Sequence, residues 1–181
     1  MKILLTLITS LLLVVNSHGQ DKTKEDAIEF TIDSSAVNTL NGTLKSLYAV
    51  ISGEKGEKRN WKQFKYLFKK DAKLIPSGKN KANIYQVRYM SPEDYIKSSG
   101  KWLEENGFFE KEISRRVNTF GPIAQVFSTY ESYYSEKDTA PFMRGINSIQ
   151  LLNDGKRWWI INIYWSQETD ENPIPKAYLP D

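Results

Sequence analysis

The order of helical and strand-like patterns along the chain predicts an α+β fold. In the first half, apolar residues recur every three or four positions, which is typical of amphipathic helices. From residue 109 to 165 the pattern changes to strand-like runs separated by turn residues. The clearest turn is Asp154-Gly155, because an Asp-Gly pair between two such runs favours a β-hairpin. Helices followed by a run of antiparallel strands indicate helices that pack on one side of a sheet.

Three helices are predicted, over residues 36–51, 60–68 and 92–106. Ser34 or Ser35 can cap the first helix, because a serine hydroxyl accepts a hydrogen bond from a free backbone amide of the first turn. Asn60 opens the second helix, with Gln63 placed to complete a capping box. Ser91 opens the third, where a proline and two acidic residues in the first turn favour helix initiation.

Six strands are predicted, over residues 74–76, 84–89, 109–120, 123–134, 142–152 and 157–165. If Asp154-Gly155 is a two-residue turn, Asn147 lies opposite Asn162 and shares one face of the sheet with it. That face is predicted to carry Asn147, Ile149, Leu151, Trp158, Ile160, Asn162 and Tyr164. The other face is predicted to carry Ile146, Ser148, Gln150, Trp159, Ile161, Ile163 and Trp165. Both faces are rich in apolar groups, so we expect both to be covered.

The N-terminal segment is typical of a secretory signal peptide. It has a positive start at Lys2, an apolar run over 3–15 that is shorter than the roughly 20 residues of a membrane span, and a small-residue exit. The predicted signal peptide covers residues 1–19, with cleavage after Gly19 or, as second choice, after Gln20. We therefore expect an exported protein, periplasmic or secreted, without a stable membrane span after cleavage. An uncleaved membrane anchor is the alternative.

The remaining sequence is predicted to form a flexible lead-in over 20–35, one domain over 36–167 and a proline-containing tail over 168–181. The lysines between residues 62 and 73 have helical spacing and fit a solvated helix face. Together with a net charge of +3, this pattern gives no indication of a nucleic-acid partner.

The residue types that most often carry catalysis are scarce. The chain has no cysteine, and its single histidine, His18, leaves with the signal peptide. The mature domain then lacks the usual thiol nucleophile and the usual proton shuttle at neutral pH. The sequence also contains no phosphate-binding loop and no zinc or calcium motif, so we expect neither a cofactor nor a metal.

Three stretches carry a resemblance to a known family. The first is Trp61-x-x-Phe64-x-x-Leu67-Phe68-x-x-Asp71-Ala72-x-Leu74, the second is Ala124-Gln125-Val126, and the third is Asp154-Gly155 followed by Trp158-x-Ile160 and Trp165-Ser166. In this order they resemble the nuclear transport factor 2-like superfamily, including its SnoaL-like, polyketide-cyclase branch. The resemblance covers residues 36–167. It implies a cone-shaped, curved antiparallel sheet packed on about three N-terminal helices, a cystatin-like roll with an internal pocket.

The resemblance also implies which residues face the pocket. The face that carries Trp158 looks inward, which predicts a pocket lined by Asn147, Trp158, Asn162 and Tyr164. Asn147 and Asn162 can alternatively pair with each other across the strands. In this family a second subunit often covers the other face of the sheet. A homodimer is therefore predicted through Trp159, Ile161, Ile163 and Trp165.

Two functional interpretations follow. The favoured one is a non-catalytic module that binds a small apolar or aromatic ligand, or assembles with a partner, because the sheet is rich in aromatic residues and poor in acid–base groups. The alternative is a small proton-transfer enzyme, an isomerase, dehydratase or hydrolase, with Glu131 as general base and Tyr164 as hydrogen-bond donor. Glu131 either faces the pocket, where burial would raise its pKa, or points to solvent.

Overall fold

The computed structural model describes residues 29–180, which excludes the predicted signal peptide and the start of the lead-in. Its helices are the 3-10 helix η1 (Ser34–Val37), α1 (Leu40–Ile51), α2 (Trp61–Leu67), α3 (Pro92–Asn106) and the 3-10 helix η2 (Lys176–Tyr178). Its strands are β1 (Phe68–Lys79), β2 (Tyr85–Val87), β3 (Phe109–Phe120), β4 (Ile123–Tyr133), β5 (Met143–Asn153) and β6 (Trp158–Gln167). No helix within this range is long and apolar enough to cross a membrane.

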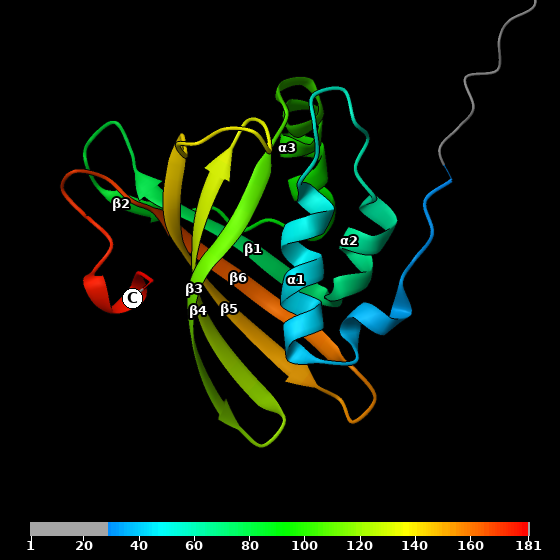
Figure 1. The fold of residues 1–181 in the computed structure, drawn as a ribbon. Helices are drawn as coiled ribbons and strands as arrows, with labels where there is room; N and C mark the ends of the chain where they lie inside the picture. The colour runs from blue at the N-terminus through cyan, green and yellow to red at the C-terminus, as the bar shows by residue number, and fades with distance from the viewer. Residues whose placement is uncertain (1–28, 181) are drawn as a thin grey trace, which may run out of the picture.

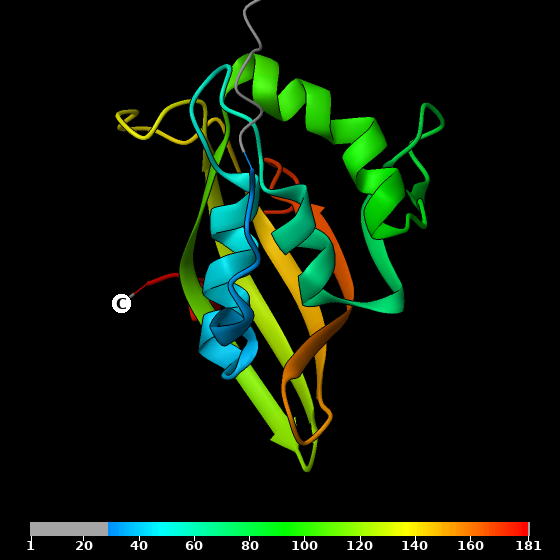
Figure 2. The ribbon, with the colours of Figure 1, turned by 90° about the vertical axis from the view of Figure 1, so that its right-hand side faces the viewer.

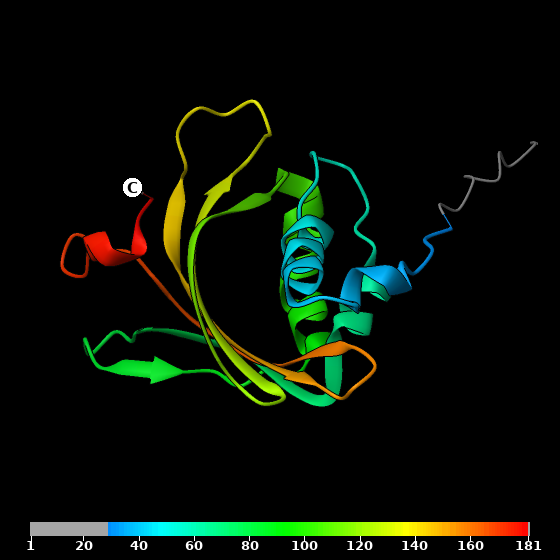
Figure 3. The same ribbon diagram turned by 60° about the horizontal axis from the view of Figure 1, so that its bottom comes forward.

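The six strands form one curved sheet in the order β2-β1-β6-β5-β4-β3 (Figure 1). The sheet bends around the helices, so that it has an inner face toward them and an outer face away from them (Figure 3). These features confirm the predicted α+β fold. One pairing departs from the antiparallel expectation, because β1 and β6 run parallel. No short hairpin joins these two strands, and only a hairpin would force them to be antiparallel.

The helix starts agree in part with the predictions. Asn60 caps α2, and Ser91 forms a capping box with Asp94 at the start of α3, as expected. The cap predicted for the first helix is wrong, because Thr39 caps α1, whereas the two serines belong to the separate helix η1. Gln63 forms no capping box, since its side-chain oxygen instead accepts a hydrogen bond from the Asp33 amide at 2.8 Å.

The hydrophobic core fills the space between the helices and the inner face of the sheet. In a view turned by 90°, α1 and α2 lie in front of the sheet and α3 crosses above them (Figure 2). Buried members of the core come from all three α-helices and from four strands, β1, β4, β5 and β6. They include Leu44, Leu47, Phe64, Leu67, Leu74, Leu103, Val126, Ile149, Leu151, Ile160 and Ile163.

The β5–β6 hairpin has a different register from the predicted one. Its loop holds four residues, 154–157, so that Asn153 lies opposite Trp158. Further along, a bulge in β6 shifts the register by one position, and Gln150 lies opposite Asn162. Because side chains alternate between the two faces, one extra residue turns every later side chain of the strand to the other face. The predicted faces of β6 are therefore wrong beyond the bulge.

The C-terminal tail lies against the outer face of the sheet, away from the helices (Figures 1 and 3). The Thr129 hydroxyl donates a hydrogen bond to the Tyr178 carbonyl at 2.7 Å. The Arg116 guanidinium donates to the Ala177 carbonyl through Nε and Nη2, at 3.2 and 2.9 Å. The Phe127 ring packs on that of Tyr178, with 5.0 Å between centroids. The chain's own tail thus covers part of the outer face.

A buried arginine holds the loop between α1 and α2 in place. Arg59 is 3% exposed, and its guanidinium donates hydrogen bonds only to backbone carbonyls. Nε donates to the Ile51 carbonyl at 3.0 Å, and Nη2 donates to the carbonyls of Gly53 at 2.6 Å and Leu103 at 3.1 Å. Since Ile51 ends α1 and Leu103 belongs to α3, this one side chain ties two helices together.

We expect Arg59→Met to lower the free energy of unfolding by about 3 kcal/mol or more, because several buried carbonyls lose their donors at once. Urea denaturation followed by circular dichroism measures the change. Arg88→Met is the matched control at an exposed position. It should change the free energy by no more than about 0.5 kcal/mol. Equal effects of the two substitutions would contradict this role of Arg59.

Candidate ligand-binding cavity

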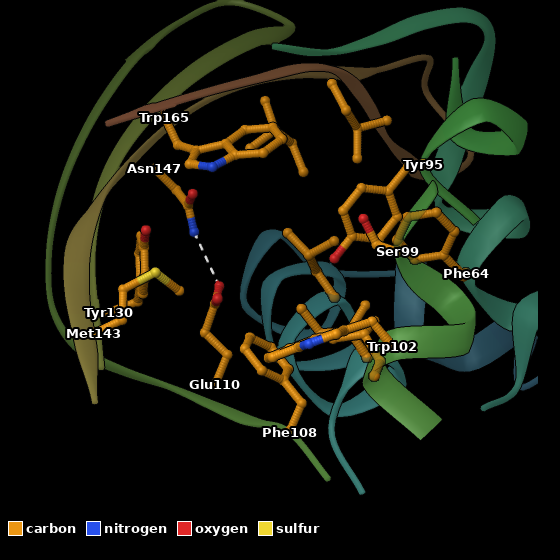
Figure 4. A pocket seen from close by; sticks show the side chains of 15 residues that line it. Phe64, Tyr95, Ser99, Trp102, Phe108, Glu110, Tyr130, Met143, Asn147 and Trp165 are labelled. Atoms are coloured by element: carbon orange, nitrogen blue, oxygen red, sulfur yellow. Dashed lines mark hydrogen bonds between the residues drawn. The ribbon is translucent and has the colours of Figure 1, made fainter. Parts of the chain in front are cut away.

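A cavity of about 190 Å³ lies between the helices and the inner face of the sheet (Figure 4). Its lining is mainly aromatic and aliphatic, with a few polar groups. The lining residues are Leu47, Ile51, Phe64, Leu74, Tyr95, Ser99, Trp102, Leu103, Phe108, Glu110, Tyr130, Met143, Asn147, Ile163 and Trp165. A cavity of this composition suits a mostly apolar molecule that carries one polar end.

Helix α3 supplies one wall of the cavity. Tyr95, Ser99 and Trp102 follow one another at intervals of four and three residues, and such positions share one face of a helix. The Tyr95 ring stacks on Phe64 of α2, with 5.4 Å between centroids and 22° between the planes. Trp102 is 43% exposed, which places it at the mouth of the cavity.

Strands β4, β5 and β6 supply the opposite wall. Tyr130 of β4 lies opposite Gly145 of β5. A Cβ atom at Gly145 would lie 2.5 Å from the Tyr130 hydroxyl, so that only glycine leaves room for this ring. On β6, Ile163 and Trp165 follow the bulge and turn into the cavity, where Trp165 lies opposite Asn147.

Glu110, near the start of β3, is the acidic residue among the side chains that line the cavity. Asn147 donates through Nδ2 to Glu110 Oε1 at 3.2 Å, which is the contact drawn in Figure 4. The Ser132 hydroxyl, directly opposite on β4, donates to Oε2 at 3.4 Å. The backbone amide of Glu110 donates to Ser52 Oγ at 3.0 Å. These contacts fix the carboxylate at the wall of the cavity.

A chain of hydrogen bonds leads from Glu110 to a second carboxylate. Asn147 Nδ2 also donates to the Tyr48 hydroxyl at 3.2 Å, and this hydroxyl lies 2.6 Å from Ser128 Oγ. Ser128 in turn donates to Glu112 Oε1 at 2.5 Å. Since Glu112 forms an ion pair with a neighbouring arginine, Arg115, the second carboxylate already has its counter-charge.

Several solved structures share this arrangement of helices and sheet. A protein of unknown function from Mycobacterium tuberculosis aligns with a TM-score of 0.55 at 9% identity, over 74% of this chain and 73% of that one. A cystatin-like protein from Nostoc punctiforme gives 0.53 at 9% identity, over 71% and 87%. An NTF-2 like protein of unknown function from Silicibacter pomeroyi gives 0.50 at 15% identity, over 71% and 92%.

The chain has the nuclear transport factor 2-like fold. By sequence, no family model and no curated protein matches the chain. At these identities the structural likeness extends to the fold alone. A shared fold does not determine function, and the features that bear on the function of this chain are those of its own cavity.

Burial raises the pKa of Glu110 from 4.5 to about 7, although the hydrogen bonds from Asn147 and Ser132 act in the opposite direction. Near neutral pH, Glu110 therefore exchanges between its neutral and its ionised form. Burial, reinforced by the nearby carboxylate, also raises the pKa of the tyrosine hydroxyls of Tyr48, Tyr95 and Tyr130. These phenols stay protonated at neutral pH and can donate hydrogen bonds.

Of the four residues predicted to line the pocket, Asn147 lies in the wall of this cavity. Trp158 is on the inner face but packs against the core beyond the cavity lining. Asn162 and Tyr164 lie on the outer face, because the β6 bulge precedes them. Asn162 donates to Gln150 Oε1 at 3.2 Å rather than pairing with Asn147, and Tyr164 is 45% exposed.

The predicted catalytic pair, Glu131 and Tyr164, does not meet at the cavity. Glu131 lies on the outer face of β4, where its carboxylate accepts a hydrogen bond from the Tyr133 hydroxyl at 2.6 Å. It also lies 3.8 Å from the guanidinium of Arg144. Even and odd positions of β4 face opposite sides of the sheet, and Tyr130, at an even position, lines the cavity. The predicted roles of Glu131 and Tyr164 in proton transfer are therefore wrong.

The residue that sequence reasoning missed is Glu110. The strand pattern has apolar Phe109 and Ile113 alternating with polar residues, which suggests that the glutamates face solvent. In the structure Glu110 and Glu112 face inward, and a bulge between Glu112 and Ser114 then reverses the alternation. The sequence does contain one signal, since Glu110 and Glu112 are two positions apart in the same strand. This spacing predicts that both side chains lie on one face of the sheet, but it does not determine whether that face is the inner or the outer one.

The face proposed for a homodimer is divided by the same β6 bulge. Trp159 lies opposite Leu152 on the outer face, whereas Ile163 and Trp165 line the cavity. Ile161 borders a separate outer groove together with Leu152. The predicted four-residue dimer surface is therefore wrong as a continuous face, and dimerisation itself stays a prediction. Within residues 29–180, no group of three or more His, Cys, Asp or Glu side chains could hold a metal ion.

Because the pKa of Glu110 is higher in the folded chain, the folded state binds more protons than the unfolded state between pH 4.5 and about 7. The free energy of unfolding should therefore fall as the pH rises through this window and level off above it. We expect Glu110→Gln to abolish this dependence and to raise the free energy of unfolding at pH 8 by about 1–3 kcal/mol.

Urea denaturation at pH 5 and pH 8 measures both effects. Glu105→Gln is the matched control, because Glu105 is an exposed glutamate of α3 that pairs with Lys101. The control should keep the pH dependence of the unsubstituted protein. If Glu110→Gln kept it as well, the carboxyl of Glu110 could not be the group responsible.

Proposed function

We propose that the protein binds a small, largely apolar molecule in the cavity, with a polar group of the ligand directed at Glu110. The observation that carries this proposal is the position of the Glu110 carboxylate in a wall that is otherwise mostly aromatic and aliphatic. Removing an acidic group from water costs free energy, so a half-buried acid with a raised pKa that lines an open cavity is a candidate for a ligand contact.

The size of the cavity limits the ligand. An engineered protein cavity of about 150 Å³ accommodates benzene, so about 190 Å³ suits a single ring with a short substituent. The stacked rings of Phe64 and Tyr95 and the indoles of Trp102 and Trp165 offer apolar contact to such a ring. The favoured interpretation, a non-catalytic ligand-binding module, therefore remains our first proposal.

We expect single-ring compounds to quench or shift the tryptophan fluorescence, because Trp102 and Trp165 line the cavity. A suitable panel is phenol, benzyl alcohol, benzylamine, benzoate and cyclohexanone. At least one should bind with a dissociation constant on the order of 0.1–1 mM, as expected for a ligand of this size. At ten times that concentration, the ligand should stabilise the fold by about 1.4 kcal/mol in thermal unfolding.

The test uses two adjacent positions of α3. Ser99→Phe places a ring in the cavity and should weaken binding at least about tenfold, because the ring occupies the ligand's volume. Ser98→Phe is the matched control, since Ser98 is exposed and does not line the cavity. Absence of binding across the whole panel, or equal binding by the two variants, would contradict the proposal.

A second candidate function is proton transfer in the same cavity, with Glu110 as the general base. The observation that favours it is a carboxyl whose pKa of about 7 matches the working range of a general base, in a cavity wall that also holds the protonated hydroxyl of Tyr130. In this scheme Glu110 removes a proton from carbon, and the Tyr130 hydroxyl in the cavity wall stabilises the negative charge that develops.

A generic substrate can test this second function. The base-promoted ring opening of 5-nitro-1,2-benzisoxazole transfers one proton from carbon to the base, breaks the N–O bond and releases an absorbing phenolate. The rate should increase with pH through about 7 and then level off, as the fraction of ionised Glu110 does. Glu110→Gln should lower kcat/KM at least about tenfold. Equal rates for the two proteins would rule out Glu110 as the base.

A further inference from the structure

We propose that the ligand of this cavity is a cation, specifically a small protonated amine with an aromatic or aliphatic body. The inference rests on the proposed function, that the cavity binds a small molecule at Glu110, and it adds the charge of that molecule. It is drawn from three features of the cavity: the charges in its wall, the unused hydrogen-bonding capacity of Glu110, and the aromatic rings around it.

The first feature is the balance of charge. The lining of the cavity holds one carboxylate, that of Glu110, and no lysine, arginine or histidine. Two arginines come from nearby elements, and both are already engaged. Arg115 pairs with Glu112, and Arg59 donates to backbone carbonyls at the ends of α1 and α3. Within residues 29–180, then, no basic side chain of the cavity wall offers Glu110 a counter-charge.

The second feature is the carboxylate itself. An ionised carboxylate has about four acceptor positions. Glu110 receives one side-chain hydrogen bond on each oxygen, from Asn147 at 3.2 Å and from Ser132 at 3.4 Å, and both are longer than a typical charge-assisted bond. The carboxylate can therefore accept further, shorter hydrogen bonds from the cavity side, and an ammonium group is a donor that also supplies the missing charge.

The third feature is the aromatic wall. Figure 4 shows the side chains of Trp165, Trp102 and Phe108 around the space that the Glu110 carboxylate faces. Tyr95 and Tyr130 add two further rings to the lining. The faces of such rings attract cations, by about 0.5–2 kcal/mol per favourable contact. Aromatic rings combined with one carboxylate are suited to an organic cation, whose apolar body contacts the rings while its charge faces the acid.

An anionic ligand fits this cavity poorly, because its charge would meet Glu110 without a basic partner. A neutral alcohol can bind through one hydrogen bond but leaves the ionised carboxylate without a counter-charge. The cation is therefore the ligand class that the wall accommodates best. Proton uptake also separates the classes, since a cation favours ionised Glu110 and a neutral hydrogen-bond acceptor favours its protonated form.

Three probes of equal ring size and different charge test the proposal: benzylamine, benzyl alcohol and benzoate. Binding is measured at pH 8 by tryptophan fluorescence and confirmed by calorimetry. Benzylamine should bind at least about tenfold more tightly than benzyl alcohol, and benzoate should bind most weakly. Glu110→Gln should remove the preference for the amine and leave the affinity for benzyl alcohol within about threefold, because Gln keeps the shape of the wall without its charge.

The pH profile provides a second readout. Affinity for benzylamine should increase between pH 6 and pH 8 as Glu110 ionises, whereas affinity for benzyl alcohol should not. Other titratable or charged groups near Glu110 come from α1, α3, β3 and β4; they are Tyr48, Tyr95, Glu112, Arg115 and Tyr130. Burial raises the pKa values of the tyrosines further above this window, whereas it raises that of Glu110 into it, so Glu110 is the group expected to titrate there.

The outcomes separate this inference from the proposed function. Binding of benzyl alcohol as tight as that of benzylamine would overturn the cation and leave the ligand-binding cavity standing. If none of the three probes binds, this inference fails, and the proposed function fails as well when the rest of the panel does not bind either. Should Glu110→Gln not fold, Trp102→Leu at the exposed mouth serves instead. It should weaken benzylamine several-fold more than benzyl alcohol, and an equal loss for both would also contradict the proposal.

Discussion

The cavity depends on one irregularity of the sheet, the bulge in β6 just before Asn162. Without it, strict alternation would direct Asn162 and Tyr164 toward the helices. With it, Ile163 and Trp165 face inward instead and complete the aromatic wall opposite α3. A second bulge in β3 follows Glu112, and bulges also bend the strands that contain them. The β6 bulge thus decides which side chains of that strand face the cavity.

The interior that results holds an acidic side chain in apolar surroundings. Two long hydrogen bonds, from Asn147 and Ser132, offset part of the free energy that is needed to remove the Glu110 carboxylate from water. The nearby carboxylate of Glu112 has more partners than that of Glu110. It forms an ion pair with an arginine and accepts a short hydrogen bond from Ser128. The contrast assigns different roles to the two acids. Glu112 belongs to the scaffold, and Glu110 is left available to whatever enters the cavity.

Much of the fold could be predicted from local signals. The capping residues Asn60 and Ser91, the long strands and the helix-first order come from patterns within a few residues, and the structure confirms them. The site could be predicted only in part, and Asn147 is the residue that was placed in the right wall. Tyr164 was assigned to the wrong face because the β6 bulge precedes it, and Glu110 was missed because the alternation of Phe109 and Ile113 with polar residues suggests that the glutamates face solvent. A bulge adds a single residue without a recognisable sequence signal, and one residue reverses every face that follows.

Ligand binding in the cavity depends on the ionisation state of one carboxyl group, and the most direct test is the titration of Glu110 by carboxyl-detected NMR, with Glu110→Gln to assign the signal. We expect an apparent pKa of about 7 in the free protein, raised by burial in the cavity. Saturating benzylamine should lower it by at least about one unit, because the cation stabilises the ionised form. A pKa near 4.5 in the free protein that does not respond to the amine would contradict the account.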